Sequence, residues 1–236
     1  MQLSTDYYMV RRNPDPFKPY WGGVTTDPDG VLRHRDSEAE RQRYLADVAA
    51  ELEFARSVPS GDILDVGAGL GWFLSALIPL GERYAIEPDL YARSRLRAQS
   101  IDLVDDIENT RPLRYGLVIC HHVIEHCPDP SRVLFGIHRT LRPGGWLIFA
   151  TPDFDSPCAQ RFGDNYRMLR DQTHVSLFTR SSADRFLVDY GFVIRDVQYP
   201  FPDRYATAEN FARWNDTSNV SPPWPGNWMT FYAQRG

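Results

Sequence analysis

The chain has 236 residues and a hydrophobic share of 42%, enough apolar material for one large domain with its own core. Its formal net charge is -5, without long charge runs, which argues against a nucleic-acid backbone as the main partner because such binding needs clustered Lys and Arg. Three cysteines without a C-x-x-C pair exclude a disulfide framework and a cysteine-rich zinc site. We therefore expect a reducing, cytoplasmic location, and no apolar run is long enough to predict a membrane span.

The first 36 residues show no sustained hydrophobic period. Residues 1–36 are rich in Pro, Gly and aromatic residues, which predicts an irregular arm. Its aromatic side chains include Tyr7, Tyr8, Tyr20 and Trp21. We expect these side chains to anchor the arm on the rest of the chain.

Residues 37–236 are expected to form a single domain that opens with a helix. Ser37 and Glu40 form a capping box, and apolar residues then recur at helical spacing, so one helix is predicted over 36–58. The Pro-Ser-Gly sequence at 59–61 ends it.

Strand and helix patterns then alternate. Strands are predicted at 62–67, 83–89, 101–104, 115–120 and 146–152, and helices at 72–80, 88–100 and 131–141, with a turn at 142–145. Alternation of this kind indicates a parallel sheet with right-handed crossovers and helices on both faces.

The pattern changes after Asp153. The stretch 154–179 is polar and irregular, and a helix is predicted at 180–191. Strands at 192–200 and 228–234 indicate an antiparallel hairpin at one edge of the sheet. The predicted fold is therefore α/β, with a doubly wound, mostly parallel, seven-stranded sheet.

A glycine-rich turn joins the first strand to its helix. Asp65 is followed by Gly67, Gly69 and Gly71, and glycine permits tight turning and close approach of a ligand to the backbone. The pattern is G-x-G-x-G, which differs from the dinucleotide fingerprint G-x-G-x-x-G and lacks the lysine of a triphosphate loop. The turn indicates a ligand close to the backbone at the start of the following helix, and a plain tight turn is the alternative.

The second strand ends in Ile-Glu-Pro-Asp. Glu87 at this tip is suited to bind both hydroxyls of a ribose. The alternative is a charge that interacts with a helix dipole, and this alternative fits Asp89 better than Glu87.

The sequence "HHVIEHCPDP" contains an H-x-x-E-H pattern, the spacing of the zinc motif of inverzincin peptidases. His122 and His126 would share a face of an α-helix, but the residues follow a strand, and Pro128 and Pro130 would break such a helix. We therefore expect no metal here.

Taken in order, the segments "ILDVGAGLGWFL", "AIEPD", "DIEN", "YGLVICHHVIEH", "LRPGGWLIFATPD" and "THVSLFT" resemble a class I S-adenosylmethionine-dependent methyltransferase. The resemblance covers roughly residues 55–200 and is strongest to the branch of the ubiquinone-pathway O-methyltransferases. It implies a Rossmann-like methyltransferase fold and S-adenosylmethionine as cofactor.

The resemblance also implies roles for individual residues, with the methionine part, the ribose and the adenine contacted in turn. The implied cofactor residues are Asp65, Gly67, Ala68 and Gly69 for the methionine part, His121 on its other side, Glu87 for the ribose, and Asp106 and Ile107 for the adenine, with Asp105 as the alternative to Asp106. Arms before the core often act as lids in this family, so Tyr7, Tyr8, Tyr20 and Trp21 are candidate lid residues. Glu125 and His126 would be structural.

Methyl transfer needs alignment of the acceptor and removal of one proton, a step suited to histidine. His174 and His122 are the candidate bases, and a purely structural role remains the alternative for each. We expect O-methylation of a sugar, a phenol or another small molecule, with N-methylation next, and no nucleic-acid or membrane partner. The rivals are a non-catalytic cofactor-binding protein and an NAD-dependent oxidoreductase, and the oligomeric state is left open.

Overall fold

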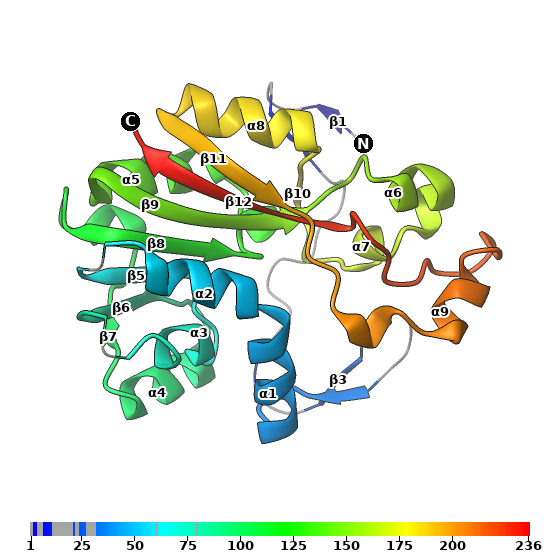
Figure 1. Ribbon diagram of the computed structural model, residues 1–236, viewed down its shortest axis with the longest axis horizontal. Coiled ribbons are helices and arrows are strands. Elements are labelled where there is room, and N and C mark those ends of the chain that lie inside the picture. The colour runs from blue at the N-terminus through cyan, green and yellow to red at the C-terminus, as the bar shows by residue number, and fades with distance from the viewer. Residues whose placement is uncertain are drawn as a thin grey trace.

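A seven-stranded mixed sheet organises the chain (Figure 1). The computed structural model describes residues 2–3, 7–10, 21, 24–26, 32–59, 61–78 and 80–236. The strands, in their order across the sheet, are β11 (Phe192–Gln198), β12 (Trp228–Arg235), β9 (Leu141–Pro152), β8 (Tyr115–His121), β5 (Ile63–Val66), β6 (Arg83–Ile86) and β7 (Asp102–Leu103). The strands β9, β8, β5, β6 and β7 run parallel, and β12 and β11 are antiparallel at one edge. The predicted sheet with its antiparallel edge hairpin is confirmed.

Helices cover both faces of this sheet. The helices of the first face are α2 (Ala49–Ser57), α3 (Trp72–Ser75) and α4 (Leu90–Ala98), and those of the second are α5 (Pro130–Thr140) and α8 (Arg180–Asp189). Along β8, Leu117 and Ile119 join the core beneath the first set, while Val118 and Cys120 join the core beneath the second. Because side chains alternate, His121 at the end of β8 emerges on the α2 side.

The single helix predicted over 36–58 is two helices. α1 (Glu38–Asp47) ends at Val48, whose backbone leaves the helical region at φ -101° and ψ 20°, and α2 begins directly after it. Leu52 and Ala55 are buried against the sheet, whereas α1 buries no residue fully. The bend lets α2 pack on the sheet while α1 runs past the carboxyl ends of the strands (Figure 1).

The polar stretch after β9 and the tail together form a small packed cap. Its elements are α6 (Pro157–Phe162), the 3₁₀ helix η3 (Gly163–Asn165), α7 (Arg167–Arg170), η4 (Asp203–Tyr205) and α9 (Ala208–Arg213). Cys158, Phe162 and Tyr166 lie in its core. The Trp214 and Trp224 rings pack against this core and stack on each other, with their centroids 4.0 Å apart. The irregular segment predicted here is therefore largely helical and stands beside the carboxyl ends of the parallel strands (Figure 1).

The arm was expected to be irregular, but its described residues include four short strands. β1 (Gln2–Leu3) and β2 (Met9–Val10) form a small sheet with β10 (Ser176–Leu177), and β3 (Val24–Thr26) pairs with β4 (Leu32–His34). The turn predicted at 142–145 lies within β9, where Gly144 has φ +70°.

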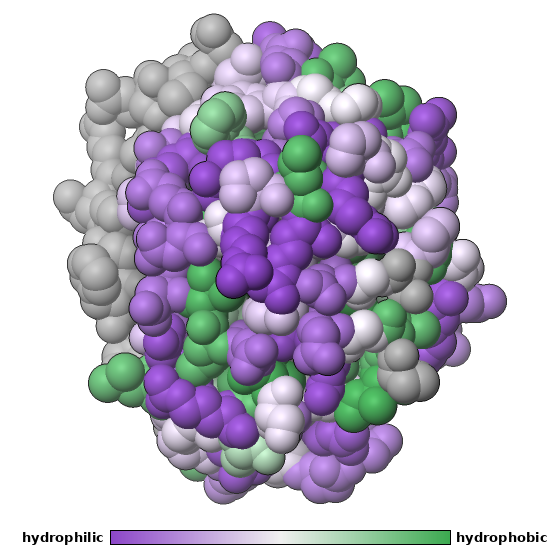
Figure 2. Space-filling model, turned by 90° about the vertical axis from the view of Figure 1, so that its left-hand side faces the viewer, coloured by the Kyte–Doolittle hydropathy of each residue, from purple (hydrophilic) through white to green (hydrophobic). Residues whose placement is uncertain are grey.

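The side of the molecule where the parallel strands begin is mostly hydrophilic, with hydrophobic side chains in separate patches (Figure 2). Among the described residues, no helix combines the length and the apolar character that crossing a membrane requires.

Candidate functional site

A cavity of about 880 Å³ opens at the carboxyl ends of the parallel strands. Its walls come from the glycine turn, the tips of β6 and β8, the first two helices and the cap. Ligands of open α/β sheets bind in this position, and the volume is near the upper end of small-molecule sites. The cavity therefore has room for a nucleoside-sized ligand and a small second molecule.

The glycine turn forms one wall of the cavity. Gly67 and Gly69 have φ values of +76° and +52°, which disfavour other residues. A Cβ on Gly67 would lie 2.3 Å from Val123, and one on Gly69 would lie 2.4 Å from the Trp21 ring. Both positions thus require glycine, and both glycines line the cavity together with Ala68.

Glu87 lies at the tip of β6, beside this turn. Its Oε2 accepts a hydrogen bond from the Gly69 N–H at 2.7 Å, and its Oε1 accepts one from the Asp89 N–H at 2.9 Å. Burial raises the pKa of Glu87, against the lowering effect of these two hydrogen bonds. The carboxylate borders the cavity, as a ribose-binding acid must.

Asp65 is buried behind the turn and is not among the residues that line the cavity. Burial, and then the nearby charge of Glu87, raises the pKa of Asp65 well above its usual value.

The residues predicted to hold the adenine lie outside the cavity lining. Asp106 binds the Arg132 guanidinium at 3.0 Å, and Asp105 binds the Arg93 guanidinium at 2.7 Å. Ile107 is buried against Gly136 of α5. The adenine roles of Asp106 and Ile107 stay predictions.

Among the described aromatic residues of the arm, Trp21 is the one that reaches the cavity. Trp21 lines it, lies on Gly69 and meets the Trp72 ring at a centroid distance of 6.5 Å. Tyr7 packs on Phe186 and Tyr8 on Phe178, away from the cavity lining. Tyr20 lies outside the described residues.

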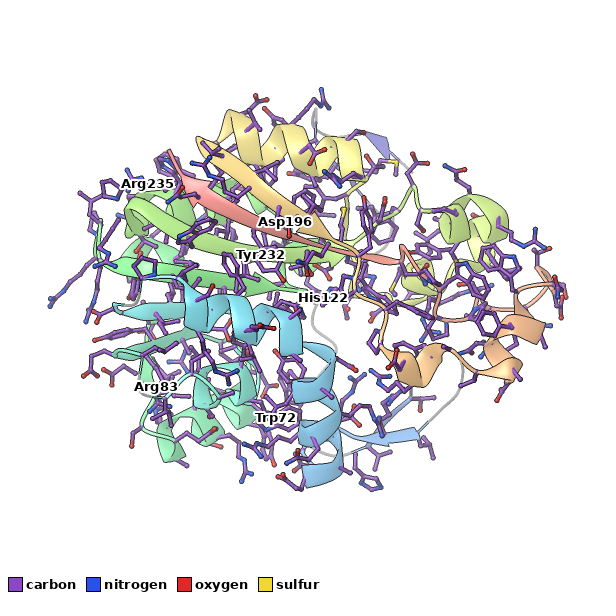
Figure 3. The ribbon with its side chains drawn as sticks, viewed as in Figure 1. Trp72, Arg83, His122, Asp196, Tyr232 and Arg235 are labelled. Atoms are coloured by element: carbon purple, nitrogen blue, oxygen red, sulfur yellow. The ribbon has the colours of Figure 1, made fainter. Side chains whose placement is uncertain are left out.

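Two histidines follow each other at the end of β8: His121 is its last residue, and His122 comes directly after it (His122 is labelled in Figure 3). His121 points toward α2, with its Nε2 3.9 Å from Oε1 of Glu51. Burial, reinforced by the neighbouring His122, lowers the pKa of His121 to about 3. His122 has the left-handed φ of +55°, which turns the chain into the cavity, and its Nδ1 lies 3.2 Å from Oε1 of Glu125.

Glu125 sits within the 3₁₀ helix η2 (Ile124–His126) and is 1% exposed. Its Oε2 accepts a hydrogen bond from the Thr151 hydroxyl at 3.2 Å. Burial raises the pKa of Glu125, but the hydrogen bond from His122 and the neighbouring histidines outweigh it and lower the pKa to about 2. His122 follows a strand, and Glu125 and His126 lie in a short 3₁₀ helix. The H-x-x-E-H residues thus do not share an α-helix, which agrees with the prediction from the sequence.

His174 meets this group from a distant part of the chain. Its Nδ1 donates to the Met168 carbonyl at 2.7 Å, and its ring centroid lies 4.9 Å from that of His126. Burial lowers the pKa of His174, which favours the neutral ring. Both rings line the cavity.

Sequence reasoning missed several residues that line the cavity. These are chiefly Tyr44, Glu51, Asp171, Tyr205 and Trp228. Glu51 is 2% exposed, and its Oε2 has no hydrogen-bond partner among the described residues. For Glu51, the signal in the sequence is an acid within an otherwise apolar helical stripe. The positions of Tyr205 and Trp228 at the cavity depend on the fold of the cap, which the sequence did not predict.

The topology and the glycine turn define a Rossmann-like nucleotide-binding fold whose antiparallel β12 departs from the dinucleotide-binding order. A family model described as "Methyltransferase domain" matches residues 37–197. The chain therefore belongs to this methyltransferase family, which confirms the class I S-adenosylmethionine-dependent methyltransferase predicted from the motifs.

Two similar curated proteins are both named ubiquinone biosynthesis O-methyltransferase. The one from Psychrobacter arcticus is 28% identical over 63% of this chain and 66% of its own length. The one from Hydrogenovibrio crunogenus is 27% identical over 41% of this chain and 44% of its own length. The chain thus spans between about half and two thirds of these relatives.

Solved structures agree on the fold. A possible histamine N-methyltransferase from Thermotoga maritima has a TM-score of 0.59 at 18% identity and covers 84% of this chain and 95% of its own. A 1,6-didemethyltoxoflavin-N1-methyltransferase from Burkholderia thailandensis, solved with S-adenosylhomocysteine, has a TM-score of 0.55 at 18% identity and covers 84% and 79%.

Proposed function

We propose that this chain transfers the methyl group of S-adenosylmethionine to a hydroxyl oxygen of a small molecule. The observation that carries the proposal is the division of the cavity into two chemically different halves. The glycine turn and Glu87 form one half. The other half consists of His122, Glu125, His126 and His174, here called the histidine–carboxylate group, and of the aromatic residues of the cap.

The first half fits the cofactor. Bare backbone at Gly67 and Gly69 permits close contact, and Glu87 offers carboxylate oxygens to ribose hydroxyls. The bound cofactor supplies an activated methyl group on a sulfonium sulfur. We assign Asp65 to the support of this half, since it lies behind the turn.

The second half fits a small acceptor with a flat face. Tyr205 stacks on Trp228 with ring centroids 5.7 Å apart, and both line the cavity with Met168. Such a wall takes the face of a phenol or a sugar. Oxygen is proposed as the methylated atom because the curated relatives carry the name of O-methyltransferases.

The acceptor must lose its proton within the histidine–carboxylate group. The imidazole rings of His174 and His122 line this side of the cavity, and both residues are proposed to take part in this step. The cytoplasmic location expected from the cysteine usage and the absence of a nucleic-acid partner stay predictions.

Calorimetric titration of the protein with S-adenosylhomocysteine, with NAD as control, tests the cofactor half. We expect micromolar binding near one per chain and no binding of NAD. A screen of phenols and sugars with methyl-labelled cofactor then separates an enzyme from a non-catalytic binding protein. Binding of NAD in place of S-adenosylhomocysteine would refute the proposal.

A further inference from the structure

A buried carboxylate without a cationic partner lies in the wall of the cavity. Glu51 comes from α2 and is 2% exposed, and among the described residues no arginine or lysine forms an ion pair with it. Its Oε1 accepts a hydrogen bond from the Thr230 hydroxyl at 3.1 Å, whereas its Oε2 has no partner in the part of the chain that the structure describes. Because a buried charge is costly unless it is paired, this oxygen is suited to a positively charged ligand.

His121 does not supply the missing positive charge. Its Nε2 lies 3.9 Å from Oε1 of Glu51, but burial, reinforced by the neighbouring His122, lowers the pKa of His121 to about 3. The ring is therefore neutral near pH 7. Burial raises the pKa of Glu51, as expected for a carboxylate whose charge lacks compensation. A cation beside Glu51 would stabilise the charged carboxylate.

An aromatic ring stands close to this carboxylate. Tyr44 of α1 lines the cavity, and its ring meets the His121 ring at 90° with centroids 6.4 Å apart. Burial, followed by nearby carboxylates that include Asp65 and Glu51, raises the pKa of Tyr44 well above its usual value. Carboxylates and the faces of aromatic rings are the groups with which proteins bind ammonium ligands. Glu51 and Tyr44 together offer both.

The charge of the cavity lining favours the same kind of ligand. Among the described residues that line the cavity, seven are Asp or Glu, three are Arg and none is Lys. One of these arginines is bound by one of the acids, since the Arg204 Nε donates to Oδ1 of Asp47 at 3.0 Å. An excess of acids attracts a cationic ligand and disfavours an anionic one.

We propose that the small acceptor carries a protonated amine in addition to its hydroxyl group, and that Glu51 and Tyr44 bind this ammonium group. The inference rests on the proposed function and deepens it, because it names the acceptor class: a phenol with an aminoalkyl chain, or an amino sugar. A small shift of the Glu51 side chain brings Oε2 to the ligand. An alkylamine is protonated near pH 7, as a lysine side chain is. A protonated nitrogen has no lone pair to attack a methyl group, so the hydroxyl oxygen remains the methylated atom.

Two matched pairs of small molecules test this site in the full chain. Tyramine and 4-propylphenol share a phenol and the length of its side chain but differ in the terminal ammonium group, and glucosamine and glucose differ in one ammonium group. Calorimetric titration of the chain saturated with S-adenosylhomocysteine measures their affinities. We expect the amine of at least one pair to bind about 10- to 100-fold more tightly than its neutral partner, as for a hydrogen bond to a charged group. In Glu51→Gln this preference should fall to about threefold or less, since a neutral amide replaces the carboxylate.

Glu53→Gln is the matched control, because Glu53 is exposed on the same helix and is not among the residues that line the cavity. It is expected to keep the full preference for the amine. Equal binding within both pairs would overturn the inference, as would failure of both amines to bind at millimolar concentration. These two outcomes need only the unmodified chain, so they hold even if Glu51→Gln does not fold. An unchanged preference in folded Glu51→Gln, or a product of tyramine methylated on nitrogen, would also overturn it.

S-Adenosylhomocysteine carries an ammonium group of its own, so its affinity in Glu51→Gln separates the two sources of the cation. Unchanged affinity supports an ammonium group on the acceptor, whereas loss of S-adenosylhomocysteine binding would assign Glu51 to the cofactor and overturn the inference. Methylation of 4-propylphenol or glucose without any preference for the amines would refute the ammonium site alone. Failure of the unmodified chain to bind S-adenosylhomocysteine would refute the proposed function, and the inference with it.

Discussion

Glu51 and His121 face each other in the cavity, with Oε1 of Glu51 3.9 Å from Nε2 of His121. Glu51 comes from α2 and His121 from the end of β8, so the bend at Val48 brings them together. The Thr230 hydroxyl donates to the same Oε1 at 3.1 Å, which leaves Oε2 of Glu51 as the oxygen without a partner among the described residues. Glu51 lines the cavity but its Oε2 is buried, and we infer that a small shift of the side chain lets this oxygen accept a hydrogen bond from the acceptor.

Glu51→Gln is therefore expected to raise the KM for the acceptor by about 10- to 100-fold, which corresponds to about 1.5–3 kcal/mol for a hydrogen bond to a charged group. Binding of S-adenosylhomocysteine should remain within a factor of about three. Steady-state kinetics and calorimetry of one preparation measure both quantities. An unchanged KM would show that Glu51 does not contact the acceptor.

The same substitution has a separate effect on stability. Burial raises the pKa of Glu51 in the folded chain, so the charge costs folding free energy above the pKa of the unfolded state, and stability falls as pH rises through the folded pKa. Glu51→Gln removes this cost. We expect the variant to melt at a higher temperature than the natural chain at pH 8, and the difference to vanish near pH 4. Equal melting temperatures at pH 8 would contradict this.

Gly69→Ala is expected to abolish cofactor binding. The added methyl group would lie 2.4 Å from the Trp21 ring, on the wall assigned to the cofactor. Gly163→Ala is the matched control, because Gly163 has φ +51° against +52° for Gly69 but no atom within 4 Å of an added Cβ. Both variants should lose folding stability, because a residue with a side chain disfavours these positive φ values. Titration with S-adenosylhomocysteine should show loss of binding only for Gly69→Ala.

Glu87→Gln is expected to weaken S-adenosylhomocysteine binding by about 10- to 100-fold, since a neutral amide replaces a charged acceptor for the ribose hydroxyls. Glu82→Gln is the control. It makes the same change in an exposed acid just before β6, at the opposite end of the strand from Glu87. Equal affinity in the two variants would remove Glu87 from the cofactor site.

Trp21→Ala tests the predicted lid. Trp21 covers Gly69, so its loss should weaken cofactor binding by about 10-fold, as expected for about 1.5 kcal/mol of aromatic contact. Tyr7→Phe removes only the hydroxyl that donates to Asp189 at 2.9 Å, outside the cavity lining, and should leave affinity unchanged. Equal effects in both would assign the arm a general anchoring role.

His121 is expected to make the folded chain sensitive to acid. Burial lowers the pKa of His121 from 6.5 to about 3, so the unfolded chain takes up a proton below pH 6.5 that the folded chain does not. Stability is complete above pH 6.5 and falls below it, by about 2 kcal/mol between pH 6.5 and pH 5. His121→Gln should remove this part of the loss. Urea unfolding at several pH values measures it, and parallel pH curves for both chains would refute it.

The parallel core of the sheet was predictable because short, largely apolar strand segments, such as 115–120, alternate with helical segments along the chain. Gly67, Gly69 and Glu87 were predictable for the same reason, since the ends of neighbouring parallel strands meet at one edge. The break between α1 and α2 at Val48 was not predictable, because the apolar spacing continues across it. Only packing on the sheet bends the chain there.

The sequence by itself determined the sheet, the glycine turn and the family, because these depend on local periodicity and on residues close together in the chain. It also placed Glu125 and His126 side by side, without a third partner. Only the tertiary structure brought His174 to them, through the cap that packs beside the carboxyl ends of the strands. The backbone carbonyl groups of Thr173 and Met168 hold the rings of His126 and His174. Such long-range contacts produce no periodic pattern in the sequence.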